Sequence, residues 1–85
     1  MTIGERIKKL RIELGMSQPE PAKKCGWGEI SYTKKGRYYI KGQLRISDYE
    51  RGHRMPSNPA LSKLAQNLHV SLSFLLEGNN EKNNA

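Results

Sequence analysis

The sequence predicts a small, mainly helical domain that carries an inserted two-stranded β-hairpin. Its 85 residues allow a single hydrophobic core. Apolar residues recur every three or four positions over most of the chain, which is typical of amphipathic helices. Over residues 28–42 that period gives way to aromatic and β-branched residues on both sides of a Lys-Lys-Gly sequence, which is typical of a hairpin. We expect a domain over residues 1–77 and a disordered tail or linker over 78–85.

Charge and cysteine content narrow the classes of partner and compartment. Fifteen Lys and Arg residues against eight Asp and Glu residues give a net charge of +7, which favours a polyanionic partner, most commonly nucleic acid. Cys25 is the only cysteine, so no intramolecular disulfide can form, and we expect it in the core of a protein from a reducing compartment. No apolar run approaches a membrane span, and the N-terminus lacks the continuous apolar segment of a signal peptide. These features predict a cytoplasmic protein.

The first helix is expected from about residue 3 to Leu14. Thr2 and Glu5 have the spacing of a capping box, and Gly15 supplies a left-handed stop. The residues of its apolar face are Ile3, Ile7, Leu10 and Leu14.

The second helix is expected to begin near Gln18, where Ser17 and Glu20 repeat the capping-box spacing. Pro19 and Pro21 both lie in its first turn. A proline beyond the first helical positions removes a backbone hydrogen bond, so we expect a shortened or distorted helix. The residues that should face inward are Ala22 and Cys25.

A hairpin over residues 28–42 pairs chemically matched residues if Gly36 takes the left-handed position of a three-residue loop. The cross-strand pairs are then Glu29 with Lys41, Ile30 with Ile40, Tyr32 with Tyr38, and Thr33 with Arg37. An isolated hairpin is marginal in water. This one must therefore either pack on the helices through its isoleucines and tyrosines or stay mobile.

Three further helices follow the hairpin. Ile46 and Tyr49 give residues 43–51 one buried face, and Gly52 closes that helix. The Pro-Ser-Asn-Pro sequence at 56–59 starts a helix whose inward residues are Leu61, Leu64, Ala65 and Leu68. Ser71 then caps a short helix over 72–77 that is apolar nearly all round, so one side of it is expected to face a partner.

Four sequence segments resemble the lambda-repressor-like helix-turn-helix family, also called the XRE type. They are IGERIKKLRIELGMSQ, AKKCG, RISDYERGHRMPS and LSKLAQNLHVSLSFLLEG, in the order that the family has them. The resemblance implies a five-helix DNA-binding domain and a transcriptional repressor. It also implies a two-fold symmetric double-stranded DNA operator bound by a homodimer, with no cofactor and no metal.

The family's base-reading positions, placed on this sequence, are Gln43, Leu44, Ser47 and Asp48 at the start of the recognition helix. A glutamine there can pair with adenine, and Leu44 can contact a thymine methyl group. Asp48 could accept from cytosine N4, or serve only as a solvated or capping residue. The positions expected at the DNA backbone are Gln18, Arg45, Arg51, His53 and Arg54. For Arg45, a phosphate and a guanine edge both remain open.

The resemblance also implies two structural contacts. Arg11 and Glu50 match a pair that bridges the first and third helices. Leu72, Leu75 and Leu76 are expected to form a small dimer interface.

The hairpin is the main departure from the family, which joins the second and third helices by a turn of a few residues. Two glycines flank the insertion and would let it project without disturbing the helices, so we expect a retained core with a ribbon that protrudes near the DNA-facing end of the third helix. Three outcomes are open. Lys34, Lys35 and Arg37 could contact the DNA backbone, the ribbon could simply be solvated, or the insertion could abolish DNA binding. The alternative function is a protein-interaction module, such as an antitoxin, with the hairpin as its docking surface. An enzyme is not expected, because His53 and His69 are far apart in the sequence and have no partners at ligand or catalytic spacing.

Overall fold

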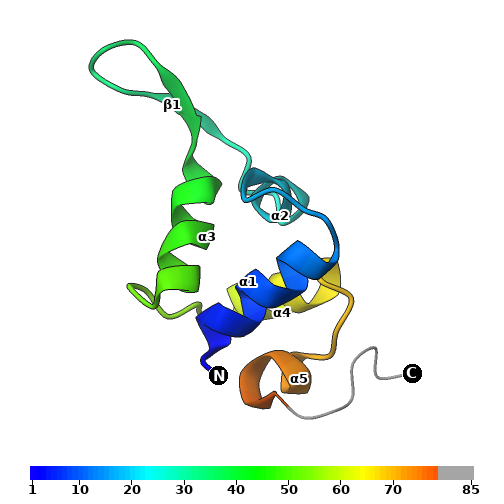
Figure 1. The fold of residues 1–85 in the computed structure, drawn as a ribbon. Helices are drawn as coiled ribbons and strands as arrows, with labels where there is room; N and C mark the ends of the chain where they lie inside the picture. The colour runs from blue at the N-terminus through cyan, green and yellow to red at the C-terminus, as the bar shows by residue number, and fades with distance from the viewer. Residues whose placement is uncertain (79–85) are drawn as a thin grey trace.

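The computed structural model describes residues 1–78 and has the mainly helical fold with a small hairpin that the sequence predicts (Figure 1). The predicted tail lies almost entirely outside the described residues. The elements, in chain order, are α1 (Ile3–Glu13), α2 (Pro19–Lys24), β1 (Ile30–Tyr32), β2 (Tyr38–Ile40), α3 (Lys41–Arg51), α4 (Asn58–Asn67) and α5 (Leu72–Glu77).

The start of α1 is the predicted capping box. The Thr2 hydroxyl accepts from the Glu5 N–H at 3.1 Å, and the Glu5 carboxylate accepts from the Thr2 N–H at 2.8 Å. The hydrogen bond from the Thr2 backbone, followed by that from its hydroxyl, holds the pKa of Glu5 below its ordinary value. At the other end, Gly15 adopts the expected positive φ of 71°.

The second helix is short, as predicted, but its cap differs from the prediction. α2 has six residues, and Pro21 lies fully buried within the core. The Glu20 carboxylate accepts from the Ser17 N–H at 3.0 Å. The Ser17 hydroxyl also donates to that carboxylate at 3.1 Å, whereas the Glu20 N–H donates to the Ser17 carbonyl at 3.1 Å, so the box is not reciprocal. Gln18 occupies the cap position without a side-chain cap bond.

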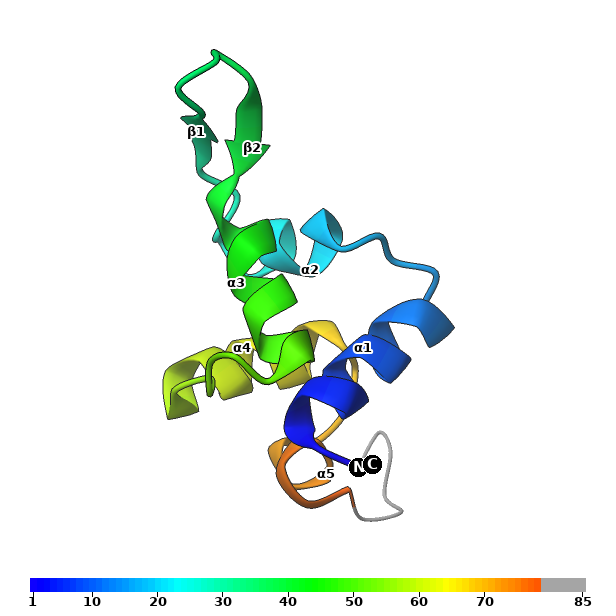
Figure 2. The ribbon, with the colours of Figure 1, turned by 60° about the vertical axis from the view of Figure 1, so that its left-hand side comes forward.

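The hydrophobic core lies between α1, α2, α3 and α4, and α5 closes it at one end (Figure 2). Cys25 is buried as expected, and this burial raises the pKa of its thiol. Arg6 of α1 donates to the backbone oxygens of Leu75 and Leu76 at 2.9 and 2.6 Å, which ties the end of α5 to α1. Within the described residues, no helix has the length and apolarity needed to cross a membrane.

The hairpin has the predicted register and, as expected, protrudes from the helices near the start of α3. Ile30 pairs with Ile40 and Tyr32 with Tyr38, and Gly36 has a φ of 82°. The hairpin projects away from the helices instead of packing on them (Figures 1 and 2). Of the two alternatives, packing on the helices does not occur for Ile30, Tyr32 and Tyr38, which are 54%, 69% and 70% exposed; Ile40 is half-buried.

β2 continues into α3 with no intervening loop, which gives the hairpin its direction. The helix therefore begins at Lys41, earlier than the expected Gln43, with Ile40 as an extended cap residue. Gly52 ends α3 in the left-handed conformation, as predicted. His69 also takes the left-handed conformation, at a φ of 59° after α4.

Candidate nucleic-acid interface

The outer side of α3 is the most accessible helical surface near the predicted site. Ile46 and Tyr49 are 0% and 2% exposed and fix the opposite side of the helix in the core. Leu44 is 55% exposed, and Asp48, one helical turn further on, is half-buried. The structure thus presents two of the four predicted base-reading residues, Leu44 and Asp48, on one outward face.

Gln43 lies at the edge of this face and is part of a hydrogen-bonded chain that links three helices. Its amide nitrogen donates to the Gln18 amide oxygen at 3.5 Å, and the Gln18 nitrogen donates to a Glu50 carboxylate oxygen at 3.3 Å. Glu50 pairs in turn with Arg11 at 2.7 Å, as predicted, in a pair whose side chains are 3% and 12% exposed. The chain brings Gln18 and Gln43 together, one at the start of α2 and the other at the start of α3.

Ser47, the fourth predicted base-reading residue, is not exposed for contact with a DNA base. It is 7% exposed, and its hydroxyl accepts from the guanidinium of Arg51, with the Arg51 Nε at 3.0 Å. The prediction that Ser47 contacts a base is wrong, because its side chain is buried and its hydroxyl accepts a hydrogen bond from Arg51.

Arg45 is held in a fixed position by two aromatic residues. Its guanidinium carbon lies 3.9 Å from the centre of the Trp27 ring, and its Nε donates to the Tyr49 hydroxyl at 2.6 Å. Trp27 also packs edge-on against Tyr49, with ring centres 6.4 Å apart. The sequence interpretation did not assign Trp27 a role, although a lone tryptophan at the border of the insertion was a usable signal.

Gly42 is a second residue whose role only the structure shows. A Cβ atom on Gly42 would lie 2.3 Å from the Trp27 carbonyl oxygen and 2.8 Å from the Ala22 Cβ. The Gly42 N–H also donates to that carbonyl at 3.1 Å. The flanking glycine is therefore required for the close approach of α2 and α3, not for freedom of the hairpin to project.

The loop after α3 exposes its side chains to solvent, whereas two of its backbone N–H groups are hydrogen-bonded within the protein. The N–H groups of His53 and Arg54 donate to the Asp48 carbonyl at 2.8 and 3.3 Å, so they already have partners. The side chains of Arg51, His53 and Arg54 are exposed. A contact of His53 or Arg54 with phosphate therefore falls to the side chain.

A shallow groove of about 540 Å³ runs along α3 at the base of the hairpin. It extends from Arg54, past Asp48 and Leu44, to Lys41 and Glu29. Arg45 and Trp27 also line it. Three cationic side chains thus border a groove that begins at the helix and ends at the hairpin.

The cations of the hairpin fall into two groups. Lys41, at its base, pairs with Glu29 at 2.8 Å, and this bond lowers the pKa of Glu29 and raises that of Lys41. Lys34, Lys35 and Arg37, around its tip, are exposed. Over residues 1–78, no carboxylate forms an ion pair with any of these three.

The predicted dimer leucines divide between surface and core. Leu72 and Leu76 are each 37% exposed, whereas Leu75 is 0% exposed and packs among the core residues. Leu75 is therefore removed from the predicted interface, because it has no surface to offer a partner.

Comparison with known proteins agrees with this geometry. Residues 41–75 match the family model described as helix-turn-helix, and the match begins where the hairpin ends. The chain is 32% identical over 76 residues to the HTH-type transcriptional regulator ImmR of Bacillus subtilis (strain 168). That match covers 89% of this chain and 49% of ImmR, so the chain spans about half the length of this relative.

Two solved structures have a similar fold. The P22 c2 repressor, solved in complex with a synthetic operator, superposes with a TM-score of 0.72 at 26% identity, covering 93% of this chain and 98% of the repressor chain. SinR, solved in a SinR/SinI complex, has a TM-score of 0.67 at 32% identity, covering 89% of this chain and 61% of its own.

Proposed function

Because this chain carries a lambda-repressor-like helix-turn-helix domain, we propose that it binds double-stranded DNA and regulates transcription, most directly as a repressor at an operator. The observation that carries the proposal is the outward face of α3, where the exposed Leu44 and the half-buried Asp48 lie beside the exposed Arg51, His53 and Arg54. A helix presented in this way fits the major groove. The P22 c2 repressor was solved on an operator, which supports the same partner class here.

Base reading falls to three residues in this proposal. Gln43 has an amide that can pair with adenine in the major groove, and its bond to Gln18 would fix the orientation of that amide. Leu44 offers apolar contact to a thymine methyl group. Asp48 can accept from cytosine N4, and its carboxylate would repel phosphates that come too close.

Backbone contacts position the helix in the groove. Gln18 would place its amide at a phosphate, where the positive end of α2 adds to the attraction. Arg51, His53 and Arg54 would contact phosphates at the far end of α3. Arg45, stacked over Trp27, borders the groove beside α3 and would reach a phosphate from there.

We further propose that the protein binds as a homodimer on a two-fold symmetric operator, with half-sites about one helical turn apart. Leu72 and Leu76 would contribute the apolar contact between the copies. The function is binding without catalysis, and the proposal places the protein in the cytoplasm with its DNA.

Selection of bound duplexes from a random DNA library tests the proposal. The wild-type chain should enrich a sequence with two-fold symmetry. Leu44→Ala, at an exposed position, should keep the fold and relax the preference at the thymine positions by a factor of about 4 per base, which corresponds to ~0.8 kcal/mol for one buried methyl group. Gln66→Ala, exposed on α4, is the matched control and should keep the selected sequence. A library without enrichment after repeated rounds would contradict the proposal.

A second candidate function is a protein-interaction module, favoured by the apolar face of the hairpin. Ile30, Tyr32 and Tyr38 are exposed on this face. SinR, whose fold is similar, was solved in complex with SinI. If this function dominates, the chain should retain partner binding when the outer face of α3 is altered and lose it when Tyr32 and Tyr38 are replaced by serine.

A further inference from the structure

The hairpin combines a rigid attachment to α3, a polar face that continues the groove beside α3, and a cationic tip that forms no ion pair within the described part of the chain. We propose that it is a second DNA-binding element, an arm that extends the phosphate contacts of the domain beyond those of its helices. The proposal rests on the proposed DNA-binding function and adds to it the partner of the hairpin.

The arm is attached to α3 through both of its strands. β2 runs directly into the helix, so its direction follows that of α3. The segment entering β1 is held by separate contacts. The Lys41 N–H donates to the Glu29 carbonyl at 2.9 Å, and their side chains form an ion pair at 2.8 Å. The Trp27 carbonyl accepts from the Gly42 N–H at 3.1 Å. An arm held at its base in this way loses less conformational freedom on binding than a flexible loop would.

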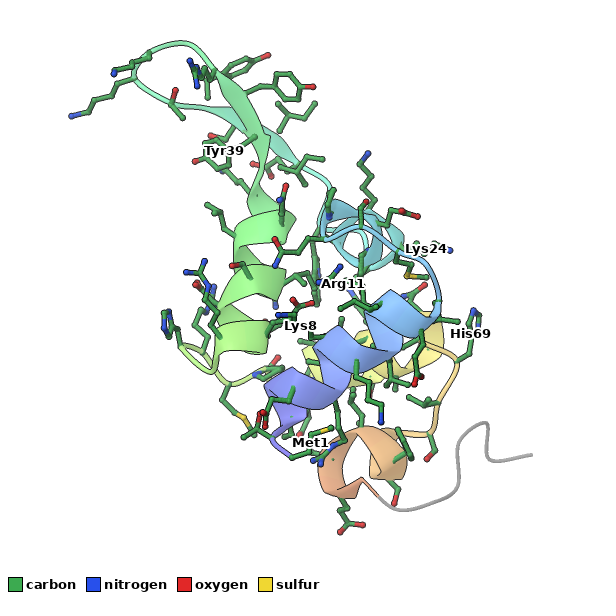
Figure 3. All side chains as sticks on the ribbon, in the orientation of Figure 1. Met1, Lys8, Arg11, Lys24, Tyr39 and His69 are labelled. Carbon is green, nitrogen blue, oxygen red and sulfur yellow. The ribbon has the colours of Figure 1, made fainter. Side chains whose placement is uncertain are left out.

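The two faces of the arm differ in character. The register places Glu29, Ser31, Thr33, Arg37, Tyr39 and Lys41 on one face. It places Ile30, Tyr32, Tyr38 and Ile40 on the other. The first face is polar and cationic, and its residues Glu29 and Lys41 line the groove beside α3. Figure 3 shows Tyr39 on the side of the arm away from the α2 side of the molecule.

Cationic side chains therefore follow one path along the molecule. Arg54 and Arg45 border the groove beside α3, Lys41 stands where the groove meets the arm, and Arg37 lies further along the same face. Lys34 and Lys35 occupy the tip. A line of cations whose outer members have no carboxylate partner within residues 1–78 matches the charge of a sugar-phosphate strand. The tyrosine hydroxyls of the arm are also donors of the kind that phosphates accept.

The length of the arm sets how far this path reaches. From Ile40 to Arg37 the chain advances about 10 Å at roughly 3.3 Å per strand residue, and the turn over residues 34–36 adds about 3 Å. Along one DNA strand, phosphates follow each other at roughly 3.4 Å of helix rise, so the tip would reach about four phosphates beyond the start of α3. The helices of the domain do not extend into this region (Figure 1).

The test compares a tip variant with a charge-matched control on the same duplex, which is the operator selected by the wild-type chain. The tip variant is K34A/K35A/R37A. The control is K9A/K24A/K63A, which removes the same charge from exposed positions on α1, α2 and α4. The affinity of each is measured over a series of salt concentrations. Loss of three phosphate contacts should flatten the slope of log affinity against log salt by about 2 to 3 in the tip variant. The control should keep a slope within about one of the wild-type value.

Hydroxyl-radical footprinting on the same duplex provides a second readout. The wild-type chain should protect about four to six nucleotides that the tip variant leaves open. A shortened arm, in which Asn-Gly replaces residues 32–38 and joins Ser31 to Tyr39, should give the same reduced footprint while α3 keeps its sequence preference.

The outcomes separate the two proposals. If the wild-type chain binds the duplex while the tip variant keeps its slope and its footprint, the arm proposal is overturned and the hairpin remains a surface for protein contact. If the wild-type chain binds no duplex at low salt, both proposals fail. A flattened slope and a shortened footprint in the tip variant, with neither in the control, support the arm.

Discussion

The guanidinium of Arg11 in α1 and the carboxylate of Glu50 in α3 form a nearly buried ion pair, with Nε and Oε2 2.7 Å apart. Glu50 also accepts from Gln18, and Arg11 also donates to the Met16 carbonyl at 2.9 Å. The pair therefore links α1, α3 and the loop that leads to α2. A buried ion pair of this kind fixes orientation more than it adds stability.

Arg11→Met is expected to lower the free energy of unfolding by about 3 to 5 kcal/mol, because it leaves the Glu50 carboxylate buried without its counter-charge. R11M/E50Q should recover much of that loss, because neither charge remains. Urea denaturation of the parent, both single variants and the double variant gives the coupling between the two residues. A single variant as stable as the parent would show that the pair is not required for the fold.

Gly42→Ala should destabilise the domain by about 1 to 3 kcal/mol or more, because the new methyl group would overlap the Trp27 carbonyl and Ala22. Gly28→Ala is the matched control at the other end of the hairpin. There the nearest atom to a new Cβ is the flexible Lys23 Cγ, at 3.3 Å. Thermal unfolding should show a large loss for G42A and a change within about 0.5 kcal/mol for G28A. Equal losses in both would indicate that backbone freedom, not close packing, is what these glycines supply.

L72K/L76K should leave the monomer folded and weaken operator binding, because the two leucines are exposed and would meet their copies in the proposed dimer. Sedimentation velocity with and without operator DNA measures the change in assembly. Leu75→Ala serves as the contrast. It should cost about 2 to 5 kcal/mol of stability through a core cavity. A dimer that survives the double lysine change would place the interface elsewhere.

Stability should fall as the solution is acidified below about pH 5, because the carboxylates of Glu5 and Glu20 accept hydrogen bonds in the folded state. These bonds lower the pKa of both groups from the ordinary value of 4.5. A lowered folded-state pKa gives stability that is present above the unfolded pKa and is lost as pH falls through the folded one. E5Q/E20Q should therefore show a flatter dependence of unfolding free energy on pH between about 3 and 5. Parallel curves for the parent and the variant would contradict this.

The sequence predicted the helices well where local rules decide them. Thr2 with Glu5, Ser57 and Ser71 mark three helix starts, and Gly15 and Gly52 mark two ends, because capping and left-handed turns depend on neighbouring residues alone. The hairpin register was likewise predictable, because Gly36 and the cross-strand pairs determine it within a dozen residues.

The candidate site was less accessible to sequence reasoning. Resemblance placed Gln43, Leu44 and Asp48 on one helix, but it could not show that Arg51 covers Ser47 or that Leu75 is in the core. The burial of Ser47 and Leu75 depends on which residues the tertiary packing places next to them, and a sequence pattern does not show those neighbours.

By itself, the sequence determined the mainly helical class, the paired strands of the insertion and the basic character of its tip, because periodicity, turn chemistry and charge are properties of short segments. The flanking glycines already indicated a protruding hairpin, but only the tertiary structure decided how it is fixed to α3. That attachment depends on contacts of Trp27 with both Arg45 and Gly42, which lie on α3 and are brought to it by the fold. The contact forms between segments on opposite sides of the insertion, so no local pattern encodes it.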